Sequence, residues 1–152
     1  MGFREDKCAE PILKNETKLN DKPLAHIIEL RNFSDPRGML NVAQNQIPFD
    51  IKRVYWIYGV PSDVRRGGHR HHRTSQALIC LGGSCSIFNN DGEKEQTFVL
   101  DAPHKVLIIE PRDWHIMHSF TENATLFVLA STPYDVTDYI DTPYPNTSFL
   151  VE

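Results

Sequence analysis

The sequence predicts an all-β protein folded as a jelly-roll barrel, and three observations support this fold class. Short apolar runs recur along most of the chain with turn residues between them, at the spacing of strands in a sandwich or barrel. No segment has the apolar period of a three-turn amphipathic helix. The ten prolines and eight glycines suit strand ends and tight turns better than helix interiors.

The predicted elements begin near residue 25. Residues 1–24 are polar and aperiodic, which predicts a weakly ordered N-terminal arm before a domain of residues 25–142 and a C-terminal tail of residues 143–152. Strands are predicted at residues 25–30, 39–43, 52–58, 76–81, 84–88, 96–100, 105–109 and 126–130. Turn signals at Gly82-Gly83 and Asn90-Asp91-Gly92 predict a hairpin meander over residues 76–100. A short helix is expected at residues 136–140, after Pro133.

Length and composition limit the class of protein. A chain of 152 residues forms one domain of ordinary core size. No apolar run approaches the roughly 18–20 residues of a membrane span, and a net charge of −4 argues against general nucleic-acid binding. Residues 1–6 lack the apolar segment of a secretory signal, so we expect a cytoplasmic protein.

The most informative segment is residues 65–72, which holds three histidines and three arginines. If this segment is extended, His69 and His71 share one face while Arg70 and His72 point the opposite way. A second group, Trp114 to His118, follows a predicted strand and brings His115 and His118 into the same region of a barrel. The two groups together predict a site.

Three interpretations of this site remain open. A His-x-His pair with a distant third His is a ligand set that transition metals accept, but the glutamate that completes the usual set is missing, since no glutamate follows before Glu93. Imidazoles also titrate near neutrality and can move protons without a metal, while Arg37, Arg65 and Arg66 supply positive charge for a phosphate or a developing enolate oxygen. The third interpretation is structural, with histidines that only satisfy backbone groups.

Aromatic residues add two further candidates. Trp114 and Tyr55 are candidates for stacking on a flat ligand, although aromatic side chains in β-structure usually belong to the core. Tyr58 lies on the opposite strand face from Tyr55, so only one of the two is expected to reach a pocket.

At these residues the chain resembles the dTDP-4-keto-6-deoxyglucose 3,4-ketoisomerases, which are cupin-fold enzymes of deoxysugar biosynthesis. The resemblance covers about residues 25–140. Its motifs, in chain order, are Asp35-Pro36-Arg37-Gly38-Met39-Leu40, residues 47–55 (IPFDIKRVY), Arg66-Gly67-Gly68-His69-Arg70-His71, Gly83-Ser84-Cys85, Asp91-Gly92, residues 114–120 (WHIMHSF), residues 129–135 (LASTPYD) and Asp138-Tyr139-Ile140.

The resemblance implies a homodimer of double-stranded β-helix subunits that binds a dTDP-linked 4-keto-6-deoxy sugar. Such an enzyme moves the carbonyl from C4 to C3 through an enediol, without redox cofactor or metal, on the way to a 3-amino-deoxysugar. The motifs assign catalytic roles to His69, His71, Arg37 and a tyrosine of the strand with Tyr55 and Tyr58, with His71 as the base at C3 and Arg37 holding an oxygen. Substrate-binding roles fall on Arg65, Arg66, Gly68, Trp114, His115 and His118.

The chain departs from the family pattern at several positions. Arg70 and His72 replace an alanine and a lysine, and both are expected to face outward with Arg73. Ile116 replaces a glutamate, and Gln44 stands where an acidic residue is common. Two other functions therefore stay open: a metal-dependent cupin enzyme, and a non-catalytic homologue that binds sugar nucleotides. Epimerisation of the same keto-sugars is a sister activity.

Overall fold

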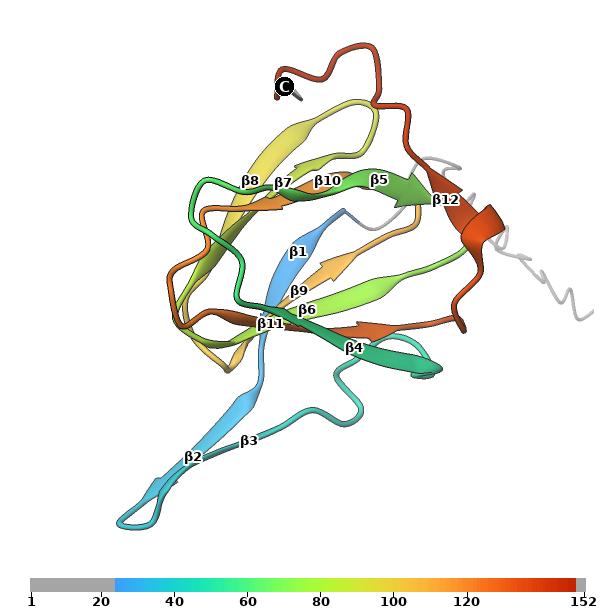
Figure 1. Cartoon of the computed structure of the whole chain (residues 1–152). Helices are drawn as coiled ribbons and strands as arrows, with labels where there is room; N and C mark the ends of the chain where they lie inside the picture. Colours follow the sequence, from blue (N-terminus) through green and yellow to red (C-terminus); the bar gives the residue numbers. More distant parts are fainter. Residues whose placement is uncertain (1–23, 150–152) are drawn as a thin grey trace, which may run out of the picture.

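The computed structural model describes residues 24–149, and in it two five-stranded antiparallel sheets face each other (Figure 1). The first sheet has the order β1 (His26–Glu29), β9 (Lys105–Ile109), β6 (Gln76–Gly82), β11 (Thr125–Ala130) and β4 (Arg53–Tyr58). The second has the order β12 (Tyr139–Ile140), β5 (Arg66–His71), β10 (Trp114–His118), β7 (Cys85–Asn90) and β8 (Glu95–Leu100). The all-β jelly-roll prediction is confirmed, whereas the predicted N-terminal arm lies outside the described residues except for Leu24.

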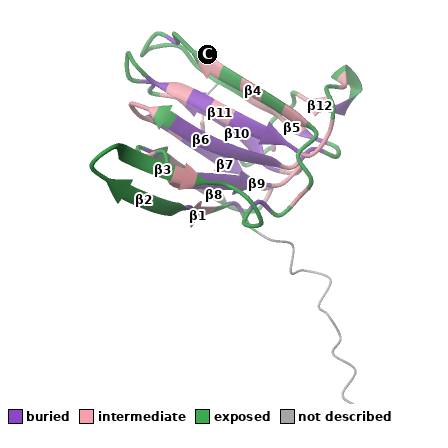
Figure 2. Cartoon of the chain, turned by 90° about the horizontal axis from the view of Figure 1, so that it is seen from below, coloured by how far each residue is buried: buried purple, intermediate pink, exposed green. Residues whose placement is uncertain are grey.

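The core lies between the two sheets. Inward-facing side chains from both sheets form one fully buried cluster that includes Leu78, Leu107, Leu126, Ile87 and Leu100. A second cluster covers the outer face of the first sheet, so β6 is buried on both faces (Figure 2). This double burial explains why residues 76–81 read as a continuous apolar run rather than as an alternating one.

The predicted meander over residues 76–100 is only half right. The hairpin of β7 and β8 forms, with Gly92 at a φ of +98° in its turn. Strands β6 and β7 do not pair, because they belong to opposite sheets. Gly83, at a φ of +61°, turns the chain from one sheet to the other. A glycine pair predicts a sharp turn but not whether the flanking strands pair with each other. The sequence therefore predicted a hairpin where the chain crosses from one sheet to the other.

A separate hairpin of β2 (Arg31–Asp35) and β3 (Gly38–Val42) extends away from the two sheets (Figure 1). Strand β2 was not among the predicted strands, because all five of its residues are exposed and show no apolar alternation. A turn from Asp35 to Gly38 joins the two strands. The helix expected at residues 136–140 is a single 3-10 turn, η1 (Val136–Asp138), followed by β12. Within residues 24–149, no helix has the length and apolar character needed to cross a membrane.

A β-bulge at Gly68 shapes the strand that carries the histidines. In the pairing of β5 with β10, His69 lies opposite His115 and Gly67 opposite Ile116, so Gly68 is the extra residue. Both glycines have positive φ, +83° for Gly67 and +77° for Gly68. Because a bulge inserts one residue, it reverses the alternation of side chains along the strand. Arg66 and His69 therefore face the same interior although three positions separate them.

We expect Gly67→Ala to lower the unfolding temperature more than Gly68→Ala. Both substitutions place a side chain at positive φ, which costs about 1–3 kcal/mol. A Cβ at position 67 would also lie 2.8 Å from the backbone oxygen of His115, whereas a Cβ at position 68 meets nothing within 4 Å. Thermal denaturation gives the difference in unfolding temperature between the two variants, where roughly 2–4 °C corresponds to 1 kcal/mol. This difference reports the energetic cost of the close approach to His115. Equal unfolding temperatures would contradict the close approach of β5 to β10.

Candidate active site

Three histidines meet at one end of the barrel. Strand alternation places His69, His71 and His115 on the inner face of the second sheet. The ring centroids of His69 lie 5.1 Å from His71 and 5.0 Å from His115, and those of His71 and His115 lie 6.2 Å apart. The sequence prediction that His69 and His71 point together is confirmed.

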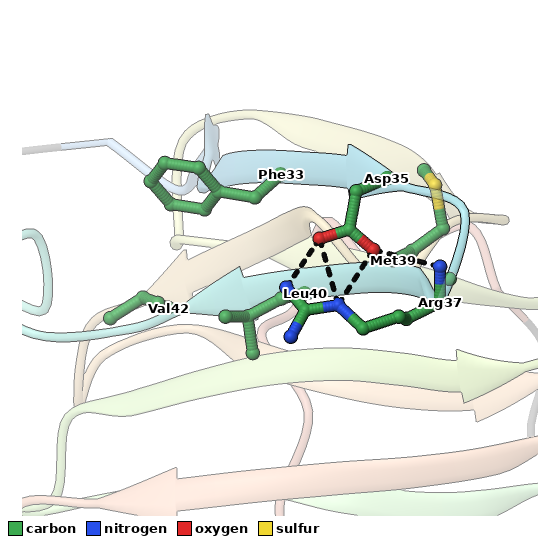
Figure 3. A pocket seen from close by; sticks show the side chains of 7 residues that line it. Phe33, Asp35, Arg37, Met39, Leu40 and Val42 are labelled. Atoms are coloured by element: carbon green, nitrogen blue, oxygen red, sulfur yellow. Dashed lines mark hydrogen bonds and ion pairs between the residues drawn. The ribbon is translucent and has the colours of Figure 1, made fainter.

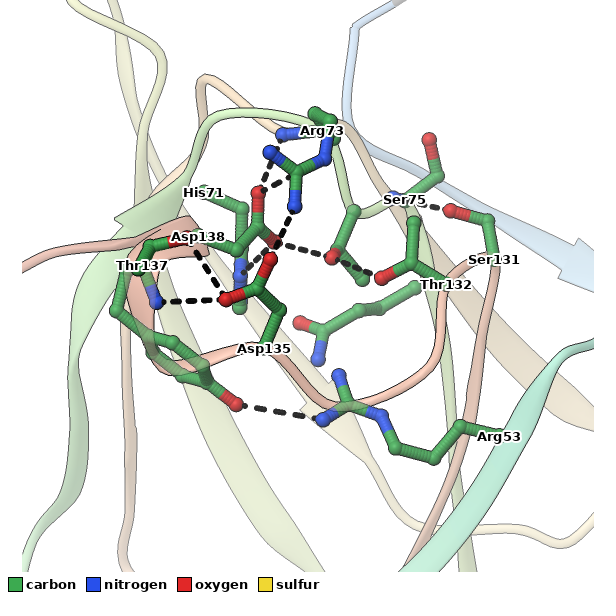
Figure 4. A network of polar contacts seen from close by, with 12 residues as sticks. Arg53, His71, Arg73, Ser75, Ser131, Thr132, Asp135, Thr137 and Asp138 are labelled. Atoms are coloured by element: carbon green, nitrogen blue, oxygen red, sulfur yellow. Dashed lines mark hydrogen bonds and ion pairs between the residues drawn. The ribbon is translucent and has the colours of Figure 1, made fainter.

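The carboxylate of Asp138 forms a hydrogen bond with the ring of His71. The Nδ1 atom of His71 lies 3.0 Å from Oδ2 of Asp138, and both side chains are 2% exposed. Asp138 in turn accepts the Arg73 backbone N–H at 2.8 Å and the Thr74 hydroxyl (Figure 4). Because a carboxylate only accepts hydrogen bonds, Nδ1 carries the proton and Nε2 presents its lone pair. Nε2 of His71 is buried and has no hydrogen-bond partner among residues 24–149.

Burial keeps all three imidazoles neutral at pH 7. It lowers the pKa of His69 to about 4, with the neighbouring His71 adding to the effect, and it lowers the pKa of His115 to about 3, with His69 adding to it. The pKa of His71 is also lowered by burial, and the hydrogen bond to Asp138 offsets part of that shift. Neutral imidazoles are proton acceptors, as a general base requires.

Burial alone would raise the pKa of Asp138. The hydrogen bonds from Thr74, the Arg73 backbone and His71 outweigh burial, so the pKa of Asp138 lies below its usual value. Asp138 is therefore a carboxylate at neutral pH. It stabilises the positive charge that His71 acquires when it takes up a proton.

A cavity of about 360 Å³ opens beside these rings. Of the three histidines, His69 lines it, while His115 is fully buried behind His69. Two arginines and three tyrosines form most of the remaining polar wall: Arg53, Arg66, Tyr55, Tyr134 and Tyr139. The cavity therefore combines a neutral base with two fixed positive charges, an arrangement suited to an anionic substrate that loses a proton.

Hydrogen bonds hold the tyrosines of this wall in place. The hydroxyl of Tyr55 accepts a bond of 2.7 Å from Nε2 of Gln76, and burial raises the pKa of Tyr55 to about 12. The ring of Tyr139 lies 4.8 Å from that of His69 and 4.7 Å from that of His71. Nη1 of Arg53 donates to the hydroxyl of Tyr139 at 3.5 Å.

Several residues that the sequence analysis assigned to the site lie elsewhere. Trp114 and His118 alternate with His115 and so face the outer side of the sheet, where each packs near Phe88 or Phe149. Arg65 lies over the ring of Phe149 on that side. Tyr58 is 70% exposed on the face of β4 opposite Tyr55, as expected for one of the two tyrosines.

Arg37 lies at the tip of the β2–β3 hairpin, away from the histidines of its own chain. Its guanidinium is 90% exposed and pairs with Asp35, with Nη2 2.6 Å from Oδ2 (Figure 3). Gly68 forms the bulge rather than part of the cavity wall. Of the predicted binding residues, the fold brings Arg66 to the cavity together with His69 and Tyr55.

The departures from the family pattern lie outside the cavity. Ile116 is buried on the outer face of the second sheet, in an apolar cluster with Phe88, Trp114, Tyr144 and Phe149. This cluster forms because residues 144–149, the described part of the predicted tail, pack across the sheet. Gln44 is exposed in the loop after β3, and Arg70 lies over the ring of Tyr144.

Five polar residues around the cavity and its histidines did not stand out by sequence reasoning: Arg53, Gln76, Tyr134, Asp138 and Tyr139. Four of them were within the quoted motifs, since Arg53 belongs to residues 47–55, Tyr134 belongs to residues 129–135, and Asp138 and Tyr139 begin the last motif. The motifs therefore contained these residues, but only the folded structure shows that residues 53 and 138 lie near residues 69 and 71. Gln76 carried no signal, because it stands at the start of an apolar strand.

The residues at this site do not fit a bound metal. In the described part of the chain, no group of three or more His, Cys, Asp or Glu side chains is arranged to hold a metal ion. Asp138 faces the back of His71 rather than the cavity, Nδ1 of His115 donates to the Asp113 backbone oxygen at 3.0 Å, and two guanidiniums line the cavity. Guanidiniums in the wall oppose a cation there.

A jelly-roll barrel with three neutral histidines at one end, one of them hydrogen-bonded to a carboxylate, defines an acid–base enzyme of the cupin type. The family described as "FdtA: WxcM-like, C-terminal" matches residues 24–148. The chain belongs to this family.

Comparisons with single proteins agree with the family. The chain is 42% identical over 116 residues to TDP-4-oxo-6-deoxy-alpha-D-glucose-3,4-oxoisomerase of Aneurinibacillus thermoaerophilus, over 75% of this chain and 84% of the relative. A 3,4-ketoisomerase from Helicobacter canadensis superposes with a TM-score of 0.75 at 38% identity, over 78% and 90% of the two chains. The QdtA 3,4-ketoisomerase from Thermoanaerobacterium thermosaccharolyticum, as a His-to-Asn mutant in complex with TDP-4-keto-6-deoxyglucose, also superposes at 0.75, with 40% identity over 80% and 89%.

Proposed function

We propose that this protein is a sugar-nucleotide 3,4-ketoisomerase that moves the carbonyl of a dTDP-4-keto-6-deoxyhexose from C4 to C3. The observation that carries the proposal is the neutral His69 on the wall of a cavity that Arg53 and Arg66 make positive. The C3 hydrogen of such a sugar is acidified by the adjacent ketone. The similarity to enzymes named for this reaction supports the same conclusion.

His69 is the side chain best placed to remove the C3 proton. The sequence motifs gave this role to His71, but His69 lines the cavity and His71 lies beside it, against Asp138. We assign the first proton transfer to His69. His71, whose positive form Asp138 stabilises, is the second proton-transfer group of the pair.

The positive cavity wall suits the anionic part of the substrate. A volume of about 360 Å³ lies within the range of small-ligand pockets and accommodates the sugar. Guanidiniums bind diphosphate oxygens and developing enolate oxygens through charge-assisted hydrogen bonds. Arg66 and Arg53 are the described residues of the wall that carry such charge.

The test of the proposed function is an incubation of the protein with TDP-4-keto-6-deoxyglucose in deuterated water, followed by NMR of the product. We expect a 3-keto sugar with deuterium at C4, because the carbon that receives the proton takes it from an exchangeable group. The configuration at C4 identifies the epimer formed. Saturable binding without deuterium in the sugar would favour the non-catalytic homologue, and turnover that depends on stoichiometric metal would favour the metal-dependent enzyme.

The product also indicates its place in a reaction sequence. A 3-keto sugar nucleotide is a substrate for transfer of an amino group to C3, so we assign the enzyme to biosynthesis of a 3-amino-deoxysugar. A coupled assay with a pyridoxal-phosphate-dependent sugar aminotransferase checks this assignment by formation of the 3-amino product.

We further propose that the protein acts as a homodimer in which the β2–β3 hairpin of one protomer lies along β4 of its partner. The hairpin exposes four large apolar side chains, and β4, which within residues 24–149 is an edge strand of its sheet, exposes three more. Exposed apolar surface of this kind on a sheet edge is typical of an interface. These residues are Phe33, Met39, Leu40, Val42, Val54, Trp56 and Tyr58.

This arrangement gives Arg37 a role in catalysis. Strand β4 borders the cavity through Arg53 and Tyr55, so a hairpin along it brings Arg37 to the partner's cavity mouth. We expect Arg37→Ala to lower kcat/KM by roughly 10–10²-fold, the loss of one charge-assisted contact. Steady-state kinetics of the variant measure this effect.

Mixing variants tests whether Arg37 acts across the interface. Arg37→Ala and His69→Asn protomers, unfolded together and refolded at equal amounts, should recover about one quarter of the wild-type activity, because half of the dimers are mixed and each mixed dimer holds one intact site. If Arg37 served the cavity of its own chain, the mixture would show no more activity than the two variants give when refolded separately. A monomer in analytical ultracentrifugation would contradict the dimer itself.

A further inference from the structure

Tyr139 packs against the rings of both His69 and His71. It belongs to β12, where it pairs with His71 of β5, so the sheet ladder fixes its position. Among the tyrosines of residues 24–149, it is the one whose ring contacts both His69 and His71, at centroid distances of 4.8 and 4.7 Å. Its side chain also lines the cavity.

The hydroxyl of Tyr139 faces a cation that pairs with no carboxylate of the described residues. Arg53 is absent from the ion pairs formed within residues 24–149, and its Nη1 donates to the Tyr139 hydroxyl at 3.5 Å (Figure 4). The guanidinium lies over the rings of Tyr55 and Tyr134, at 5.4 and 5.7 Å from their centroids. A guanidinium beside a hydroxyl interacts favourably with negative charge that develops on that oxygen during a reaction.

Isomerisation requires proton transfer at oxygen as well as at carbon. As C3 loses its proton, the carbonyl oxygen at C4 must gain one, and later the hydroxyl at C3 must lose one to become the new carbonyl. The two oxygens stand on adjacent carbons and therefore lie within reach of a single group. The proposed histidine chemistry accounts for the carbon transfers and leaves the oxygen transfers unassigned.

We propose that Tyr139, polarised by Arg53, is the catalytic residue that carries a proton from the C3 oxygen to the C4 oxygen. The inference rests on the proposed ketoisomerase function.

The step balances in two halves. In the first, His69 takes the C3 proton, the C–H electron pair forms the C3–C4 double bond, and Tyr139 donates its proton to the C4 oxygen, leaving a phenolate beside Arg53. In the second, the phenolate takes the proton of the C3 hydroxyl, the C3 carbonyl forms, and the electron pair of the double bond accepts a proton at C4 from a protonated histidine of the pair. Tyr139 ends as it began, and no outside oxidant or reductant takes part.

Tyr55 is a poorer candidate for the same role. Its hydroxyl is held by Gln76 at 2.7 Å, and burial raises its pKa to about 12. Tyr139 differs from it in contacting both histidines.

The experiment compares Tyr139→Phe with Tyr144→Phe in deuterated water. Phenylalanine keeps the ring that packs on the histidines and removes only the hydroxyl. Tyr144 is the matched control, because it lies on the outer face and donates to the Arg112 backbone oxygen at 2.8 Å. Tyr139→Phe should lower the rate of product formation at least about 10²-fold. The rate at which the C3 hydrogen of recovered substrate exchanges with solvent deuterium should fall less. Tyr144→Phe should keep both rates.

The ratio of C3 exchange to product formation distinguishes the outcomes. A rise of this ratio in Tyr139→Phe supports proton transfer between the oxygens, whereas a proportional loss of both rates would show that Tyr139 only positions the histidines and would overturn the inference. A turnover close to wild type would overturn it as well. If the wild-type protein neither exchanges nor isomerises the sugar, the proposed function itself fails.

Discussion

Replacing His69 with Asn is expected to lower turnover by about 10²–10⁴-fold, the usual contribution of a general base. Asparagine keeps a hydrogen-bonding side chain of similar polarity but has no basic nitrogen. The expected loss follows from the position of His69, which is neutral at pH 7 and is the one of the three imidazoles that lines the cavity. NMR in deuterated water measures both product formation and exchange at C3, and both should fall together because deprotonation at C3 precedes every later step.

His118→Asn is the matched control for this prediction. His118 lies on the neighbouring strand but faces outward, near Phe149 and the hydroxyl of Ser119. This variant should retain wild-type turnover. The parallel variant His71→Asn should also be strongly impaired; if it abolishes C3 exchange while His69→Asn retains it, the base is His71 and the assignment made from cavity geometry is wrong.

Replacing Asp138 with Asn is expected to lower turnover on the order of 10²–10⁴-fold, although Asp138 does not line the cavity. The amide removes the charge that stabilises protonated His71 and allows the opposite tautomer of its ring. The acid limb of the pH–rate profile supplies a second readout. The Asp138 carboxylate raises the pKa of His71 against the effect of burial, so its removal should move the His71 contribution to that limb to lower pH.

Asp135→Asn is the control, because Asp135 belongs to the same segment and pairs with Arg73 and Thr137 without touching His71. It should keep turnover and the pH profile. Thermal denaturation of both variants separates loss of the fold from loss of the charge. Since the folded-state pKa of Asp138 lies below its usual value, the stability that this group contributes is present at neutral pH and is lost as the pH falls through that folded-state pKa. A pH profile of Asp138→Asn with an unchanged acid limb would contradict the role in tuning His71.

The strands were predictable because apolar side chains dominate their burial. Residues 105–109, for example, form β9 with the bounds that their apolar run predicts. Sheet membership was not predictable, since the same glycine turn serves a hairpin or a crossing between sheets, and β6 and β7 make the crossing. Strand β2 escaped notice because its residues are exposed in this chain, and the proposed dimer gives the physical reason: residues that face a partner need not follow the alternation of a core.

The histidines were predictable from period-two alternation, but the arginines and carboxylates around them were not. Alternation alone places Arg66 and His69 on opposite faces, and the bulge at Gly68 brings them to one face. Alternation also assigns Trp114 and His118 to the face opposite His115, a distinction that motif matching did not make. Asp138 and Tyr139 come from a segment almost seventy residues away from His71. Only the tertiary structure shows that Asp138 forms a hydrogen bond with the His71 ring and that the ring of Tyr139 packs against it.

Strand β12 has a consequence for the synthesis of this protein. All three histidines lie within the first 118 residues, whereas Asp138 and Tyr139 arrive with a two-residue strand close to the end of the described chain. The ribosome covers the last residues that it has made, so the barrel strands emerge before the segment that orients His71. A nascent chain therefore carries the histidines without Asp138 and Tyr139 until residues 138 and 139 have left the ribosome, and the site stays incomplete up to that point.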